Sequence, residues 1–135
     1  MPDADGRPRD LDNLLGLEAV IDSGSGGRAV IRYRARPEMC HSGGIVQGGF
    51  VTGWIDQAMA HVAVAATNHE FSVLTLEIKI SFLEAATPGP VIAEAWIERR
   101  GKSIAFVEGR IMDAKGLVLA KASSTVRLVP VKRAR

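Results

Sequence analysis

Hydrophobic and polar residues alternate with a period of two over most of the second half of the chain. Such alternation is typical of strands with one buried face. Four segments show it, at residues 73–83, 91–99, 103–112 and 117–128. In the first segment, one face is predicted to carry Leu74, Leu76, Ile78, Ile80 and Phe82, and the other face Thr75, Glu77, Lys79 and Ser81. Four consecutive strands joined by short loops predict a strongly twisted antiparallel sheet.

Residues 49–66 show a helical period instead. Their apolar side chains recur every three or four positions and form one broad stripe. The other side is almost uncharged as well, and a helix that is apolar nearly all round is a buried helix. We therefore expect the sheet to wrap around this helix, which gives an α+β fold. The stripe consists of Val51, Trp54, Ile55, Ala58, Met59, Val62 and Ala66.

The N-terminal part of the chain predicts a short helical turn at residues 10–15 and a hairpin of residues 17–22 and 28–35 with a glycine-rich turn. Residues 1–12 are expected to form a disordered lead-in, 13–129 the single domain and 130–135 a basic tail. The 135 residues and 47% hydrophobic content suit one globular domain.

Charge and cysteine content narrow the function classes. The net charge is +2, and no basic stripe with interleaved aromatic residues predicts nucleic-acid binding. No apolar run approaches the roughly 20 residues that span a bilayer, and the N-terminus lacks the apolar run of a signal peptide. Cys40 is the single cysteine, so no intrachain disulfide is possible. We expect a cytoplasmic protein without a membrane partner, and three scattered histidines predict no metal site.

Asp56 is the only charged residue of the predicted helix, and no lysine or arginine lies between Arg36 and Lys79. A buried, unpaired carboxylate costs several kcal/mol, roughly, unless it is hydrogen-bonded or reaches a polar cleft. Small neighbours such as Gly53 and Ala60 leave room for a ligand. Asp56 is therefore the predicted general base or nucleophile; the alternative is a carboxylate that faces solvent without a function.

The glycine-rich loop of residues 43–49 leads directly into this helix. The first amides of a helix are unpaired donors at its positive end, and they can stabilise an oxyanion. Gly49 precedes Asp56 by seven residues, which is about 10.5 Å along the axis. One helix cannot place both groups at one reacting centre, so a site that uses both requires an extended substrate or a second protomer.

This order of loop, acid-bearing helix and four long strands resembles the hotdog-fold acyl-CoA thioesterases of the phenylacetate-degradation (PaaI-like) type. They belong to the superfamily of 4-hydroxybenzoyl-CoA thioesterase, and the resemblance covers about residues 14–128. Two positions depart from the family pattern: His41 replaces the usual Asn and Gln47 the usual His. The positions that match the family pattern are Gly44, Gly48, Gly49, Asp56 and Thr75.

The resemblance implies hydrolysis of a thioester to free acid and coenzyme A, with no cofactor other than the coenzyme A of the substrate. Asp56 would act as base or nucleophile, Gly49 would supply the oxyanion amide, and Thr75 would hold the attacking water. Gln47 would donate a hydrogen bond, and His41 would orient groups or shuttle protons. The resemblance also implies a homodimer or homotetramer, in which one subunit supplies the acid and another the amide. Substrate binding would involve Gly48, Arg99, Arg100 and Lys102.

Two other classes of function remain open at this point. Because Gln47 cannot carry a proton, the chain could be a non-catalytic acyl-CoA or lipid-binding module. A hotdog enoyl-CoA hydratase or dehydratase would require a histidine paired with the acid, and His41 is the only candidate for that role.

Overall fold

The computed structural model describes residues 10–131, so the lead-in expected over residues 1–9 and the tail residues 132–135 lie outside the described part. The chain forms α1 (Asp10–Leu15), β1 (Leu17–Ser23), β2 (Arg28–Ala35), a 3₁₀ turn (Pro37–Met39), α2 (Gly48–Ala66), β3 (Phe71–Phe82), β4 (Gly89–Arg100), β5 (Ile104–Asp113) and β6 (Val118–Pro130). α1 thus includes residues 10–12, which were expected to belong to the lead-in. Asp12 of α1 is 5% exposed and accepts a hydrogen bond from Gln57 of α2.

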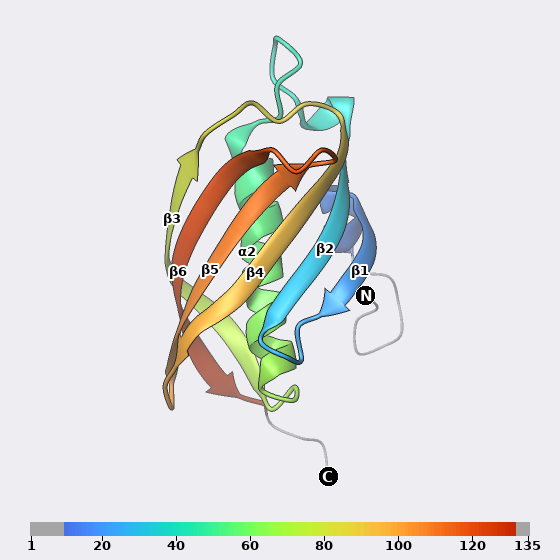
Figure 1. Ribbon diagram of the computed structural model, residues 1–135. Helices are drawn as coiled ribbons and strands as arrows, with labels where there is room; N and C mark the ends of the chain where they lie inside the picture. The colour runs from blue at the N-terminus through green and yellow to red at the C-terminus, as the bar shows by residue number, and fades with distance from the viewer. Residues whose placement is uncertain (1–9, 132–135) are drawn as a thin grey trace.

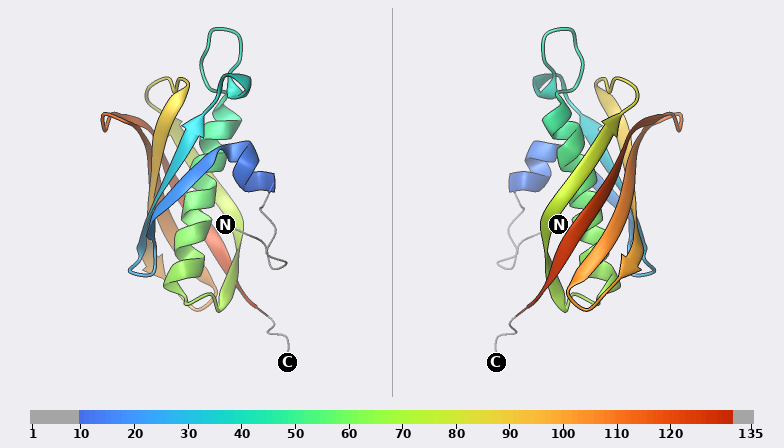
Figure 2. Two further views of the ribbon diagram at one scale, coloured as in Figure 1. Left: turned by 90° about the vertical axis from the view of Figure 1, so that its right-hand side faces the viewer. Right: turned by 90° about the vertical axis from the view of Figure 1, so that its left-hand side faces the viewer.

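All six strands join one antiparallel sheet in the order β1-β2-β4-β5-β6-β3. The sheet curves around α2, as Figures 1 and 2 show. The expected α+β hotdog arrangement, one long helix wrapped by a long antiparallel sheet, is confirmed. Both edges of the sheet, β1 and β3, have one side without a strand partner within residues 10–131.

The last four strands form the expected antiparallel sheet, but they do not all pair in sequential order. β3 does not pair with β4; it pairs with β6 at the far edge of the sheet, whereas β4 lies between β2 and β5. Residues 83–88 make this crossing at the end of the sheet where α2 begins (Figure 1). This short loop bridges the two sides of the curved sheet, which the wrapping around α2 brings together.

β3 contains a β-bulge that changes which side chains face the helix. The register with β6 shifts between Thr75 and Glu77, so that Leu76 has no partner in β6. Before the bulge, Thr75 is half-buried, whereas Leu74 is 54% exposed and Leu76 53% exposed on the outer face. After the bulge, Ile78 and Ile80 pack against the core. The prediction that these leucines and isoleucines share one face is wrong, because the extra residue reverses the alternation.

The predicted apolar stripe of α2 does face the sheet. Trp54, Ile55 and Val62 are fully buried, and the indole Nε1 of Trp54 donates to the carbonyl of Leu15 at 2.7 Å, which ties α1 to α2. The opposite side of α2, including Gly53 and Asp56, is only half-buried, so the sheet leaves one face of the helix partly open. Neither described helix has the combination of length and apolar character that a membrane span requires.

Candidate active site

Asp56 and Thr75, predicted separately from the sequence, lie together in the structure. Asp56 is half-buried near the middle of α2, and the Thr75 hydroxyl donates to its Oδ1 at 2.9 Å. Within residues 10–131, no cation forms an ion pair with Asp56. The bulge makes this contact possible, because it leaves Thr75 on the helix-facing side of β3. The pair is therefore a carboxylate with one oxygen hydrogen-bonded and the other available.

A network of hydrogen bonds holds Gln57, the residue next to Asp56 in the sequence. The Tyr33 hydroxyl donates to Gln57 Oε1 at 2.6 Å, and Gln57 Nε2 donates to Asp12 Oδ1 at 2.8 Å. Burial, and secondarily the charge of Asp12, raises the pKa of Tyr33, so its hydroxyl stays protonated and remains a donor. The sequence analysis missed this network, because its three members are distant in sequence and no motif links them.

The start of α2 is capped by a side chain. Gln47 precedes the helix, and its Oε1 accepts a hydrogen bond from the Gly49 amide at 2.8 Å. A Cβ atom on residue 49 would lie 2.6 Å from that oxygen, so glycine makes room for the cap. The Gly48 amide has no hydrogen-bond partner in the described part of the chain. Of the two amides, Gly48 rather than Gly49 is thus the free donor in this structure.

Removing this cap should destabilise the helix end measurably. We expect Gln47→Ala to lower the free energy of unfolding by about 1 kcal/mol, because the Gly49 amide loses its acceptor. Urea denaturation followed by circular dichroism measures this change. Gln47→Asn is the control, since asparagine is a favoured N-cap and should keep the stability of the parent protein. Equal stability of the alanine variant and the parent would show that the cap contributes little.

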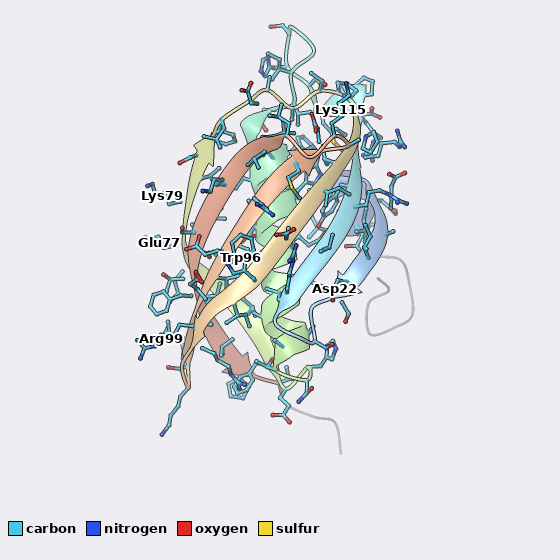
Figure 3. All side chains as sticks on the ribbon, in the orientation of Figure 1. Asp22, Glu77, Lys79, Trp96, Arg99 and Lys115 are labelled. Atoms are coloured by element: carbon cyan, nitrogen blue, oxygen red, sulfur yellow. The ribbon has the colours of Figure 1, made fainter. Side chains whose placement is uncertain are left out.

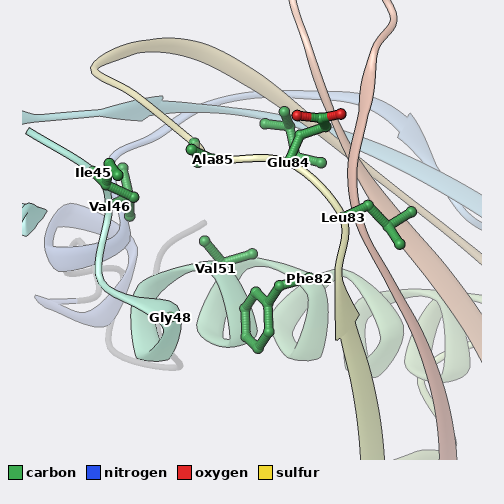
Figure 4. Close-up of a pocket in the computed structure, with 10 residues that line it drawn as sticks. Ile45, Val46, Gly48, Val51, Phe82, Leu83, Glu84 and Ala85 are labelled. Carbon is green, nitrogen blue, oxygen red and sulfur yellow. The ribbon is translucent and has the colours of Figure 1, made fainter.

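An open groove lies beside the free Gly48 amide. It has a volume of about 420 Å³ and separates the start of α2 from the end of β3 (Figure 4). Phe82 at the end of β3 is 57% exposed, and its ring is near Gly48, where an added Cβ would lie 3.2 Å from Cζ. The lining is largely apolar and includes Ile45, Val46, Val51 and Leu83.

The structure does not bring His41 to Asp56. His41 is exposed in the loop that precedes α2, and its Nδ1 lies 3.1 Å from the carbonyl oxygen of Ser42. This loop extends beyond the end of the sheet (Figure 2), whereas Asp56 is two turns into the helix. Any role of His41 in the chemistry would therefore require a substrate or a second subunit that reaches this loop.

Arg99, Arg100 and Lys102 lie at the opposite end of the molecule from Gly48. They are exposed around the β4–β5 turn, and Figure 3 shows Arg99 at the lower end of the sheet, pointing outward. The Arg100 guanidinium carbon is 5.7 Å from the centroid of the Phe71 ring. Within one chain, the predicted phosphate-binding residues and the free Gly48 amide thus lie at opposite ends of α2.

Among residues 10–131 there is no group of three or more side chains suited to hold a metal ion.

Comparisons with known proteins agree on the family. A family model described as the thioesterase superfamily matches residues 43–120. A curated protein of Saccharolobus solfataricus, named a putative esterase, is 34% identical over 71% of this chain and 68% of its own length. A Ralstonia eutropha structure titled as a putative thioesterase related to phenylacetic acid degradation has a TM-score of 0.78 and 28% identity, covering 90% of this chain and 92% of that one.

A second solved structure shares the fold. It is a hypothetical thioesterase from Streptococcus pneumoniae, crystallised with coenzyme A, with a TM-score of 0.77 and 16% identity. The alignment covers 85% of this chain and 88% of that chain. The segment matched by the family model contains both Gly48 and the Asp56–Thr75 pair.

Proposed function

The chain belongs to the thioesterase superfamily and is a thioester hydrolase, and from this premise we propose that it hydrolyses acyl-CoA esters with Asp56 as the central group. The observation that carries the proposal is the hydrogen bond between Thr75 and a half-buried Asp56 that has no cationic partner within residues 10–131. A carboxylate placed this way can accept a proton from water instead of serving an ion pair.

The proposed reaction is the addition of water to the thioester carbonyl. Asp56 takes a proton as the water oxygen bonds to the carbonyl carbon; the carbon–sulfur bond then breaks, and the thiolate is protonated to give coenzyme A and the free acid. The Thr75 hydroxyl donates a hydrogen bond to Asp56 Oδ1, and its oxygen keeps two lone pairs that can accept a hydrogen bond from the same water. Direct attack by Asp56 through an anhydride is the second form of this mechanism.

The oxyanion donor that we propose is the amide of Gly48, with Gly49 as a second donor when Gln47 turns away. Gly48 is the first residue of α2, and its free amide lies at the positive end of the helix. The Gly49 amide is engaged by Gln47 in this structure. On this proposal, the first donor is the residue before the expected Gly49, and Gln47 controls access to the second donor.

A complete site on this proposal requires two subunits. Gly48 and Asp56 of one helix are eight residues apart, about 12 Å along the axis. β3 is a long edge strand whose outer side is open within residues 10–131, and such edges pair readily with another chain. Antiparallel pairing of two β3 strands would reverse the second subunit, bringing its helix start and its groove toward the Asp56 of the first. We propose a homodimer of this kind.

Coenzyme A fits this assembly. The groove beside Gly48 could receive the apolar part of the pantetheine arm. Reversal of the second subunit would also bring its Arg99, Arg100 and Lys102 to the end of the assembly where α2 of the first subunit begins. There they could contact the phosphates of coenzyme A. The coenzyme A bound to the Streptococcus pneumoniae protein of the same fold supports this choice of substrate carrier.

The direct test is thiol release from a panel of short, long and aromatic acyl-CoA esters, together with an enoyl-CoA. Release of free coenzyme A from any of these esters supports the proposal. Tight binding of the esters without turnover would favour a binding module, and hydration of the enoyl-CoA would favour a lyase. Either of the last two results would contradict the proposed reaction.

Thr75 provides a more specific test of the site. We expect Thr75→Val to lower kcat about tenfold to a hundredfold, because the carboxylate loses a charge-assisted hydrogen bond without a change in side-chain shape. Thr75→Ser retains the hydroxyl and should stay within a few-fold of the parent enzyme. The measurement is steady-state hydrolysis of the best ester in the panel. Equal loss in both variants would point to packing rather than the hydroxyl.

A further inference from the structure

A second pocket continues the Asp56–Thr75 site along the half-open face of α2. It has a volume of about 420 Å³, within the range of ligand pockets, and lies between the C-terminal half of α2 and the start of β3. Its exposed surface is mostly apolar, and its polar members are two histidines, one glutamine and one serine. The residues that line it are Gln57, Ala60, His61, Val64, His69, Ser72 and Val73.

The pocket lies next to the Asp56 carboxylate because α2 and β3 contribute residues to both. Ala60 lies one helical turn after Asp56, and Val73 lies two residues before Thr75 on the same face of β3. From Asp56 to Val64 the helix rises about 12 Å. A thioester with its carbonyl at Asp56 can therefore extend its acyl group along α2, away from Gly48.

His69, at the end remote from Asp56, has an unusual backbone. α2 ends in a hydrogen-bonded turn in which the Asn68 amide bonds to Ala65 and the His69 amide to Val64, and Asn68 has φ 54°. Asparagine is a usual residue at that position of a helix end. His69 follows with φ 60°, a left-handed conformation that a histidine adopts at a cost in free energy.

Histidine is among the non-glycine residues that occur more often in this conformation, but glycine would adopt it without the cost. His69 is part of the pocket lining, and an imidazole can donate or accept one hydrogen bond there.

We propose that this pocket receives the acyl group of the thioester and that His69 selects acyl chains with a hydrogen-bonding oxygen at the end remote from the thioester. The inference rests on the proposed hydrolysis of acyl-CoA esters. The apolar walls contact the body of the chain, and the imidazole binds the terminal oxygen. His69 is thus a specificity-determining residue, separate from the proton transfer at Asp56.

The test compares octanoyl-CoA with ω-hydroxyoctanoyl-CoA as substrates of the parent protein, His69→Gly and Asn68→Gly. We expect the parent to favour the hydroxylated ester about tenfold in kcat/KM, the worth of one net hydrogen bond. In His69→Gly this ratio should fall to about one. Asn68→Gly is the matched control: it changes the same turn but does not line the pocket, and it should keep the parent ratio. Circular dichroism and Tm of both variants check that the fold is intact.

A binding measurement separates the pocket from the reaction. Calorimetric titration of both esters into Asp56→Asn, with and without His69→Gly, should show the same preference in Kd. A preference in Kd without turnover by the parent would support the pocket and overturn hydrolysis. Turnover with the same substrate ratio in parent and His69→Gly would overturn the pocket and leave hydrolysis standing. Failure of both esters to bind would overturn both.

Discussion

Asp56→Asn is expected to lower kcat for acyl-CoA hydrolysis about a hundredfold to ten-thousandfold, the range typical of losing a general base. Asparagine has nearly the shape of aspartate, and its amide oxygen can still accept the hydrogen bond from Thr75. It cannot take a proton from water at neutral pH. Because Asp56 has no ion pair within residues 10–131, the substitution leaves no charged partner unsatisfied, and the fold should be preserved.

The measurement is thiol release under saturating ester, with circular dichroism and Tm as the check on folding. Asp22→Asn is a matched control, because it removes the same charge from a carboxylate outside the proposed site. Asp22 accepts a hydrogen bond from the Gly24 amide in the β1–β2 turn. We expect this control to hydrolyse esters at the parent rate. Parent-like turnover by Asp56→Asn would remove the carboxylate from the mechanism.

The second large effect is expected at the open edge of the sheet. The double substitution Leu74→Lys and Leu76→Lys should convert the proposed dimer to monomers and reduce hydrolysis to near background. Both leucines are more than half exposed on β3, so lysine costs little within one chain. Across a β3–β3 contact, however, the change would place like charges close together, which destabilises strand pairing. Activity should fall with the dimer, because the amide and the acid come from different subunits.

Sedimentation equilibrium reports the mass, and thiol release reports the activity of the same samples. Ile21→Lys is the control, since this residue is 57% exposed on β1, the edge strand at the other side of the sheet. This variant should keep both the dimer and the activity. A double variant that is monomeric yet fully active would show that one chain contains the complete site.

The sequence predicted most element positions well. Periodicity located the strand of residues 28–35 and the buried stripe around Trp54 to Val62, because burial of one face imposes the pattern directly. The Asp56 and Thr75 hypotheses also converge in one hydrogen bond. The unpaired carboxylate was visible in the sequence, since no cation nearby along the chain could neutralise it.

Long-range and single-atom features were not accessible from the pattern. The pairing of β3 with β6 depends on the path around α2, which loop length alone does not encode. The bulge at Leu76 has no glycine or proline to mark it, so regular alternation was assumed across it. The capture of the Gly49 amide by Gln47 depends on one side-chain conformation, and it is the reason that we propose Gly48 as the first donor.

The bulge divides β3 into two parts that both present alternate residues to the inside of the fold. Phe71 and Val73 pack against the core before the bulge, and Ile78 and Ile80 do so after it. For protein engineering, Val73 is the position of the first part at which we expect a change to alter substrate preference, because it also lines the second pocket. Deleting Leu76 would merge the two parts into one regular strand, because Thr75, Ile78 and Ile80 would then face the helix by simple alternation.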